Sequence, residues 1–334
     1  MKSCPVTGSS CHLDSSLQAD PARQPIRLAI IRYVISGLIL AAFVVLVEVY
    51  FGWSALLRPW LQLSLAKMLM AVALVLISYW LRAMRLYDYF RDEMHTKFSL
   101  CLKLMLQHNL VNNLLPMRMG ELSFPVLMTR YFKVPMIRSF PALLAFRLLD
   151  LHTLFLFALI TVAGHWLGMI ATVVLLCAWV ALPCVAITFS GRLGSFIATR
   201  PPGKLRSWLN QAWTGLPQTP RSFYMSWMWT LINWAVKLGV FAWILMMFID
   251  VPLAAAWTGA ITGDLTSVLP IHGLAGAGTF EAGVVTGLMP YRVSASAALQ
   301  AAINLHIFVL ATTLIGGALS LLLGPSRGNN RQYG

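Results

Sequence analysis

The chain has 334 residues, of which 58% are hydrophobic and only 11% are charged, whereas roughly a quarter of a typical soluble domain is charged. This composition excludes an ordinary soluble enzyme and a disordered chain. The net charge of +14 does not indicate nucleic-acid binding, because the Lys and Arg residues fall mainly between apolar runs, where they set topology and contact anionic lipids. The sequence therefore predicts a membrane protein.

Six apolar runs are close to the roughly 20 residues that a spanning helix needs. They cover residues 28–51, 61–81, 139–163, 168–189, 222–249 and 296–323. A polar stretch that begins with Arg82 and Arg85 follows the second run and is expected to be a cytoplasmic loop. The polar residues 1–25 are expected to form a flexible cytoplasmic tail, and residues 325–334 a second, short one.

Two further apolar segments, 98–128 and 254–289, contain helix-breaking and charged residues. The expected breaks are Pro116 and Gly120 in the first segment, and Pro270, Gly273, Gly276 and Gly278 in the second. A single crossing by the first segment would place the basic loop 130–138 outside, against the positive-inside rule. Each segment is therefore predicted to enter the membrane, break and return on the same side.

The order of spans and breaks occurs twice, in residues 26–163 and 164–324, with the second half starting from the opposite side. The predicted fold is an all-α polytopic integral membrane protein, an inverted-topology repeat with six full spans and two re-entrant broken hairpins. Such repeats are typical of secondary transporters. The expected location is a bacterial-type cytoplasmic (inner) membrane, with both termini in the cytoplasm.

The candidate site residues lie at and beside the two breaks. They are Asn112, Asn113, Arg118, Glu121, Arg147 and Asp150 in the first half, and Asp264, His272 and Glu281 in the second. A charged side chain in the bilayer costs roughly 2.5 kcal/mol or more, so each needs a partner or a function. Glu121 and Glu281, which occupy matching positions, can serve as proton sites, headgroup contacts, helix caps or ion-pair partners.

The other candidates have a functional interpretation, a structural one, or both. Arg118 can hold a phosphate with two hydrogen bonds or pair with Glu121, and Asp264 can line a cavity or cap a helix. Arg147 and Asp150 are three residues apart on a helix and are expected to pair with each other. Asn112 and Asn113 can satisfy freed backbone groups, whereas His272 and His306 can relay protons or form ordinary hydrogen bonds.

No soluble catalytic motif, cofactor-binding motif or metal-ligand spacing occurs in the sequence. Cys4, Cys11 and His12 lack the second ligand pair of a metal site. We therefore expect no catalytic residues, no metal and no cofactor.

Three motifs together resemble the transmembrane region of the lysylphosphatidylglycerol synthase family. They are Asn112-Asn113-Leu114-Leu115-Pro116-x-Arg118-x-Gly120-Glu121, Arg147-x-x-Asp150-Leu151, and Leu269-Pro270 followed by glycines and Phe280-Glu281. The resemblance covers roughly residues 28–323, although Met117 stands where family members often have glycine. It implies lipid translocation and, because the family's cytoplasmic aminoacyl-transfer domain is absent from this sequence, argues against aminoacyl transfer.

The leading hypothesis is a flippase-like transporter for a lipid with a polar or phosphate headgroup, with the proton gradient as a candidate driving force. Its expected partners are membrane lipids with an anionic or glycosylated headgroup, and a lipid-synthesis protein is a further candidate. Two alternatives stay open: a membrane-embedded enzyme that acts on a lipid phosphate, and a non-transporting subunit of a lipid or envelope synthesis complex.

Overall fold

In a computed structural model, which describes residues 38, 41–115, 120–199, 202–266 and 274–323, the chain is helical and its described part contains no β-strand. A helix covers Ala41–Tyr50. After it come the α-helices α2 (Trp53–Leu57), α3 (Leu65–Tyr89), α4 (Arg91–Met94), α5 (Phe98–Leu114), α6 (Ser123–Phe132), α7 (Met136–Trp166), α8 (Met169–Ala198), α9 (Lys204–Trp213), α10 (Pro220–Phe248), α11 (Leu253–Thr266), α12 (Thr279–Leu288) and α13 (Ala295–Leu322), with short 3-10 helices at Arg58–Gln62, Leu274–Gly276 and Met289–Tyr291.

Four helices in the described part are long and apolar enough to cross a membrane: α3, α7 over Met136–Thr161, α10 and α13. A fifth candidate is the pair Ala41–Tyr50 and Trp53–Gln62, which is bent by 85°. Helix α8 matches the expected run 168–189 in position, and Met169–Val185 is its apolar stretch among the residues whose side chains are described. The protein is thus a multi-pass membrane protein with four or five candidate spans among the described residues.

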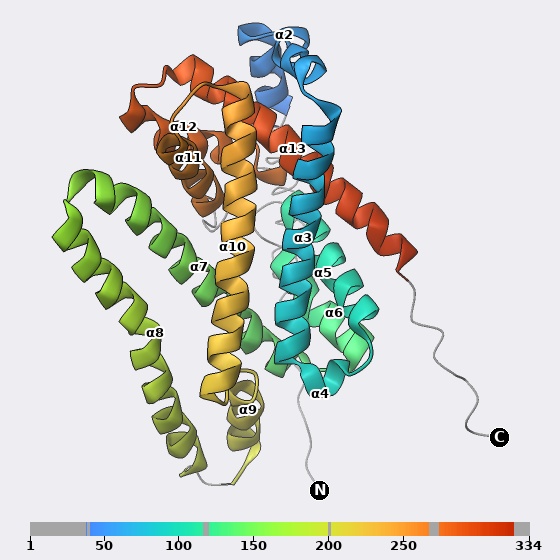
Figure 1. The fold of residues 1–334 in the computed structure, drawn as a ribbon. Helices are drawn as coiled ribbons and strands as arrows, with labels where there is room; N and C mark the ends of the chain where they lie inside the picture. The colour runs from blue at the N-terminus through green and yellow to red at the C-terminus, as the bar shows by residue number, and fades with distance from the viewer. Residues whose placement is uncertain (1–37, 39–40, 116–119, 200–201, 267–273, 324–334) are drawn as a thin grey trace, which may run out of the picture.

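Helices α3 and α10 lie side by side in the centre and run in opposite directions (Figure 1). The first broken hairpin, α5 and α6, follows the lower end of α3 in this view. The second broken hairpin, α11 and α12, follows the upper end of α10. The two hairpins therefore extend toward the middle of the molecule from opposite ends.

Each broken hairpin has its own apolar core. The first core joins α3, α5, α6 and α7 around Leu86, Phe124 and Phe146. The second joins α3 with α10, α11, α12 and α13 around Phe241, Val284 and Phe308. Each core therefore packs one hairpin against its neighbouring long helices.

Glycines allow the second hairpin to close tightly. A Cβ on Gly283 would lie 2.6 Å from the backbone oxygen of Thr262, and one on Gly287 would lie 2.8 Å from that of Thr258. Two glycines four residues apart on each arm, Gly259 and Gly263 facing Gly283 and Gly287, form a small-residue contact of the kind that membrane helices use.

One expectation from the sequence was wrong. The stretch after residue 81 does not begin a loop, because α3 continues as a regular helix to Tyr89. Arg82 and Arg85 are consequently helical, and both side chains face the protein interior, where Arg85 is buried and Arg82 half-buried.

Candidate functional site

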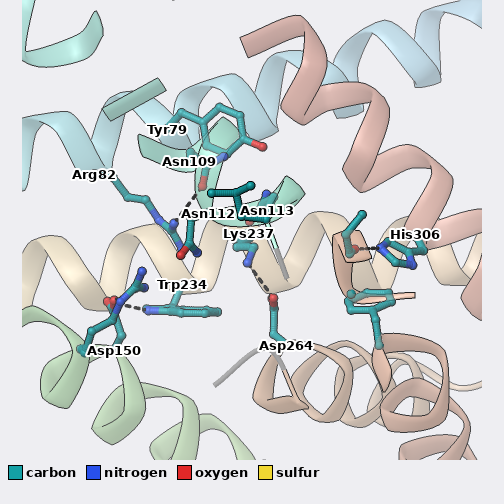
Figure 2. A pocket seen from close by; sticks show the side chains of 15 residues that line it. Tyr79, Arg82, Asn109, Asn112, Asn113, Asp150, Trp234, Lys237, Asp264 and His306 are labelled. Carbon is teal, nitrogen blue, oxygen red and sulfur yellow. Dashed lines mark hydrogen bonds and ion pairs between the residues drawn. The ribbon is translucent and has the colours of Figure 1, made fainter. Parts of the chain in front are cut away.

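A polar cavity of about 120 Å³ lies where the two broken hairpins approach each other (Figure 2). Seven α-helices of the described part contribute to its lining: α3 with Tyr79 and Arg82, α5 with Asn109, Asn112 and Asn113, α7 with Arg147 and Asp150, α10 with Trp234 and Lys237, α11 with Asp264, α12 with Phe280, and α13 with His306. Ala275 and Gly276 of the second break complete the wall. Three charged residues predicted from the sequence, Arg147, Asp150 and Asp264, therefore meet at this cavity, although they are distant in the chain.

Asp150 is the centre of a buried cluster at one end of the cavity. Its Oδ1 accepts hydrogen bonds from Arg85 at 2.7 Å and from the indole nitrogen of Trp234 at 3.0 Å. Arg85 also donates to Thr230 at 2.8 Å. Because α3, α7 and α10 each supply a member, this cluster ties together three of the long helices.

Arg147 joins the first break to α7. The expected pair with Asp150 is present, with 3.5 Å between Arg147 Nη1 and Asp150 Oδ2. The shorter contact, 3.0 Å from Arg147 Nε, is to Glu121 Oε1. Glu121 is therefore an ion-pair partner that holds the chain just before α6 against α7.

Arg82 differs from the other basic residues of the cavity. Its guanidinium donates to Asn109 at 3.4 Å and lies 5.6 Å from the Trp234 ring centroid. Its Nε is buried and has no hydrogen-bond partner, and no carboxylate of the described residues forms an ion pair with it. A guanidinium in this position has donors to spare for an anion in the cavity.

Lys237 and Asp264 form an ion pair of 2.7 Å across the cavity (Figure 2). The carboxylate belongs to the last turn of α11, where the helix dipole disfavours negative charge. Lys237 offsets this charge, and its ammonium also lies 4.7 Å from the Trp234 ring centroid and 5.0 Å from that of Phe241. Asp264 therefore lines the cavity, which is one of its two expected roles.

Glu281 is almost completely buried, with 1% of its surface exposed. Its Oε2 accepts from the backbone N–H of Gly278 at 2.8 Å and so caps the start of α12. Its Oε1 lies 2.6 Å from His306 Nδ1. The structure thus gives Glu281 the expected capping role and adds a histidine partner.

The two asparagines of the first motif differ in their contacts. Asn113 donates to the hydroxyl of Thr313 on α13 at 2.9 Å. The amide oxygen of Asn112 is buried at the cavity without a hydrogen-bond partner. The backbone of Asn112 also explains why residue 120 is glycine, since a Cβ there would lie 2.3 Å from the Asn112 Cα.

The second break is present at the predicted glycines. Gly276 and Gly278 have φ angles of +82° and +85°, which residues with a side chain rarely adopt. The predicted residues Pro116, Arg118, Pro270, His272 and Gly273 lie outside the described residues.

Four residues that shape the site were not predicted as part of it: Arg82, Arg85, Trp234 and Lys237. The sequence predicts a loop for Arg82 and Arg85, and it indicates no role at the site for Trp234 or Lys237. A signal was present, because the apolar positions Tyr79, Ala83, Leu86 and Phe90 continue the helical spacing past residue 81.

No group of three or more His, Cys, Asp or Glu side chains suited to a metal ion occurs in the part of the chain that the structure describes. The charged groups that meet there are instead arranged in pairs, with basic side chains in excess. Such an arrangement can bind a polar or anionic group inside the membrane.

Comparison with known proteins gives one match. The family model described as the lysylphosphatidylglycerol synthase TM region matches residues 30–317. No curated protein and no solved structure matches the chain. Because the family match extends over nearly the whole membrane region and includes both broken hairpins, the chain belongs to the lysylphosphatidylglycerol synthase TM region family.

Proposed function

We propose that the protein is a flippase-like transporter that moves a lipid with a polar or phosphate headgroup between membrane leaflets. The single observation that carries this proposal is the charged cavity at the meeting point of the two broken hairpins. A headgroup would pass through this cavity while the acyl chains stay in the surrounding lipid. Charged residues at membrane depth are costly, so their concentration here points to a polar substrate.

The charge balance of the site favours an anionic headgroup. Among the described residues and apart from the His306–Glu281 pair, four basic side chains face three carboxylates: Arg82, Arg85, Arg147 and Lys237 against Glu121, Asp150 and Asp264. Arg82 carries the surplus charge and the unused donors. A phosphate or a similar anion matches a guanidinium in both charge and hydrogen-bond geometry.

The arrangement of helices supports the inverted repeat that transport by alternating access would use. Contacts occur in corresponding pairs: α5 packs on α13 and α11 packs on α7, α3 packs on α5 and α10 packs on α11. Each broken hairpin also packs on the long helix that follows it, α6 on α7 and α12 on α13. We infer two re-entrant hairpins of opposite orientation in a cytoplasmic membrane, with both termini in the cytoplasm.

A flipping assay in vesicles tests the proposal. The purified protein is reconstituted with fluorescent lipids that carry anionic, zwitterionic or glycosylated headgroups, and the fraction that reaches the outer leaflet is measured with a membrane-impermeant quencher. We expect protein-dependent movement that is fastest for an anionic headgroup and is slowed by Arg82→Gln. Imposing a proton gradient in either direction shows whether movement is proton-driven.

The same vesicles distinguish the two alternatives. Mass spectrometry of the extracted lipids detects a chemically altered headgroup, which would identify an enzyme. Absence of both movement and alteration for every lipid would oppose the transporter and favour a subunit that needs a partner protein.

A further inference from the structure

The His306 side chain connects two points of the second break. It is 6% exposed, and its ring lies 4.8 Å from the Phe280 ring, centroid to centroid. Its Nε2 lies 2.9 Å from the backbone oxygen of Ala275, while its Nδ1 lies 2.6 Å from Glu281 Oε1. His306 also lines the cavity, together with Ala275 and Gly276 of the break.

These two contacts determine how many protons the pair holds. A backbone oxygen only accepts, so Nε2 must carry a hydrogen when it bonds to Ala275. The contact between Nδ1 and the carboxyl group then needs a second hydrogen, carried by the imidazole or by Glu281. The pair as observed therefore holds one proton more than a neutral histidine beside an ionised glutamate.

Removing that proton leaves a lone pair of one imidazole nitrogen facing a lone pair of an oxygen. If Nε2 keeps its hydrogen, Nδ1 faces the Glu281 carboxylate without one. If the hydrogen moves to Nδ1, then Nε2 faces the Ala275 oxygen without one. In either case the deprotonated pair loses one of the two contacts.

The contact with Ala275 holds backbone in an unfavourable conformation, and Glu281, the other partner of His306, caps a turn at a glycine of positive φ. Ala275 has a φ angle of +54°, in the left-handed region that non-glycine residues rarely adopt. Glu281 caps the N–H of Gly278, whose φ is +85°. A strained segment of this kind persists only while its surroundings hold it.

We propose that His306 and Glu281 form a binding site for one proton. The bound proton keeps the second break closed, which here means in the conformation that the structure shows for Ala275 to Gly278. When the proton leaves to water in the cavity, one contact is lost and the segment from Ala275 to Gly278 is released. The proton is thus a ligand of this site, and its occupancy sets the conformation of the break.

The other charged groups around the cavity are largely paired with one another. Lys237 of α10 pairs with Asp264 of α11, and Arg147 of α7 contacts Asp150. Among the remaining elements that pack on α13, α5 presents asparagines at the cavity, α2 contains no titratable residue, and α3 presents Tyr79 and Arg82. Among the described residues at the cavity, Arg82 is the basic side chain that forms no ion pair with a carboxylate.

Glu281→Gln separates the protonated state from the ionised one. A glutamine amide donates to Nδ1 of a neutral His306 whose Nε2 hydrogen still bonds to Ala275, and its carbonyl oxygen accepts from Gly278. Every contact of the proton-loaded pair is therefore kept without the additional proton, so no contact depends on a proton that leaves as pH rises. The variant should keep the observed conformation of the break at high pH.

Hydrogen–deuterium exchange of the parent protein and Glu281→Gln, each in lipid nanodiscs, measures the break directly. After correction for the intrinsic pH dependence of exchange, parent peptides that cover residues 275–282 should lose protection at high pH. The loss should be about tenfold or more, the factor expected when a hydrogen bond to a charged group is lost. Protection in Glu281→Gln should not be lost at high pH. Equal behaviour of the two proteins would overturn the proposal.

A second measurement removes the dependence on one variant. Solid-state NMR of ¹⁵N-histidine reports the protonation of each ring nitrogen, and His306→Gln identifies the signals of His306. We expect one proton to leave the pair as pH rises, whereas His152, which bonds to backbone outside the cavity, is the control. A pair that never changes its proton count would also overturn the proposal. Neither measurement uses lipid movement, so its result is separate from that of the flipping assay.

Discussion

Arg85 on α3 donates a hydrogen bond of 2.7 Å to Asp150 on α7, and both side chains are buried at the end of the polar cavity. The contact joins residues that are 65 positions apart in the chain. It helps to fix the wall of the cavity, because Asp150 also accepts a hydrogen bond from Trp234 and contacts Arg147.

Loss of either partner should therefore destabilise the protein strongly. We expect Arg85→Met or Asp150→Leu to lower the free energy of unfolding by about 3–5 kcal/mol, since each leaves a buried charge without its main partner. Unfolding in mixed micelles with increasing SDS measures the change. The double variant should cost less than the sum of the two single variants. Single-variant losses below about 1 kcal/mol, the range of exposed pairs, would contradict the importance of this contact.

Arg82 should determine how tightly an anionic headgroup binds. We expect Arg82→Gln to weaken binding by about tenfold or more, the factor that a lost hydrogen bond to a charged group implies. Arg82→Lys should fall between the parent and Arg82→Gln, because an ammonium keeps the charge but not the planar donor geometry. Binding of a phosphatidylglycerol analogue to protein shown to be monodisperse measures the difference. The control is Lys67→Gln, which removes an exposed positive charge from the same helix; parent-like binding by Arg82→Gln would remove Arg82 from the site.

Glutamates at the two breaks should be needed for lipid movement. We expect Glu121→Gln and Glu281→Gln to insert and fold normally but to slow flipping. Glu121→Gln weakens the ion pair with Arg147, and Glu281→Gln removes the titratable carboxyl group. Glu48→Gln changes an exposed glutamate that bonds to the backbone of Trp53 and serves as the control. Parent-like flipping rates for both break variants would identify these glutamates as caps and ion-pair partners only.

The side of the membrane on which each connection lies follows from the proposed topology. Lys133 and Lys204 should be cytoplasmic, whereas Leu167 and Asp250 should face the other side. All four positions are exposed. Cysteines introduced at these positions, one at a time in a background without the five native cysteines, should react with an impermeant maleimide from the expected side. Labelling of residue 133 only from the outside would show that the first hairpin crosses the membrane.

The elements of the site were predictable where the signal is local. The glycines of the second break and the low number of charged residues in apolar segments identify Gly276, Gly278, Asp264 and Glu281 from the sequence alone. These residues stand out because a backbone break or a charge is unusual at membrane depth.

The partners of these residues could not be predicted, because they come from distant helices. Nothing near Asp264 in the sequence points to Lys237, and nothing near Asp150 points to Arg85. The prediction for Arg82 and Arg85 was wrong because it relied on the rule that positive residues lie in cytoplasmic loops. That rule describes an average, and α3 instead continues as a helix to Tyr89. Only the packing of α3 against α10 and α5 turns these two residues inward.

The tight closure of the second hairpin leads to a last prediction. A Cβ on Gly287 would lie 2.1 Å from the hydroxyl of Thr262 and 2.8 Å from the backbone oxygen of Thr258, so Gly287→Ala should force α11 and α12 apart. Overpacking of this kind costs about 1–3 kcal/mol. Gly239→Ala is the matched control, because its Cβ would meet only Trp257 at 3.8 Å and alanine favours a helix over glycine by roughly 1 kcal/mol.

Unfolding in mixed micelles should therefore show a loss of stability for Gly287→Ala and none for Gly239→Ala. Adding Thr262→Ala removes the nearest side-chain atom but leaves the backbone contact with Thr258. Stability should return only in part in Gly287→Ala/Thr262→Ala, because backbone cannot move aside as a side chain can. Full recovery would show that the hydroxyl alone sets the spacing, and a neutral Gly287→Ala would show that the two arms are farther apart than these contacts require.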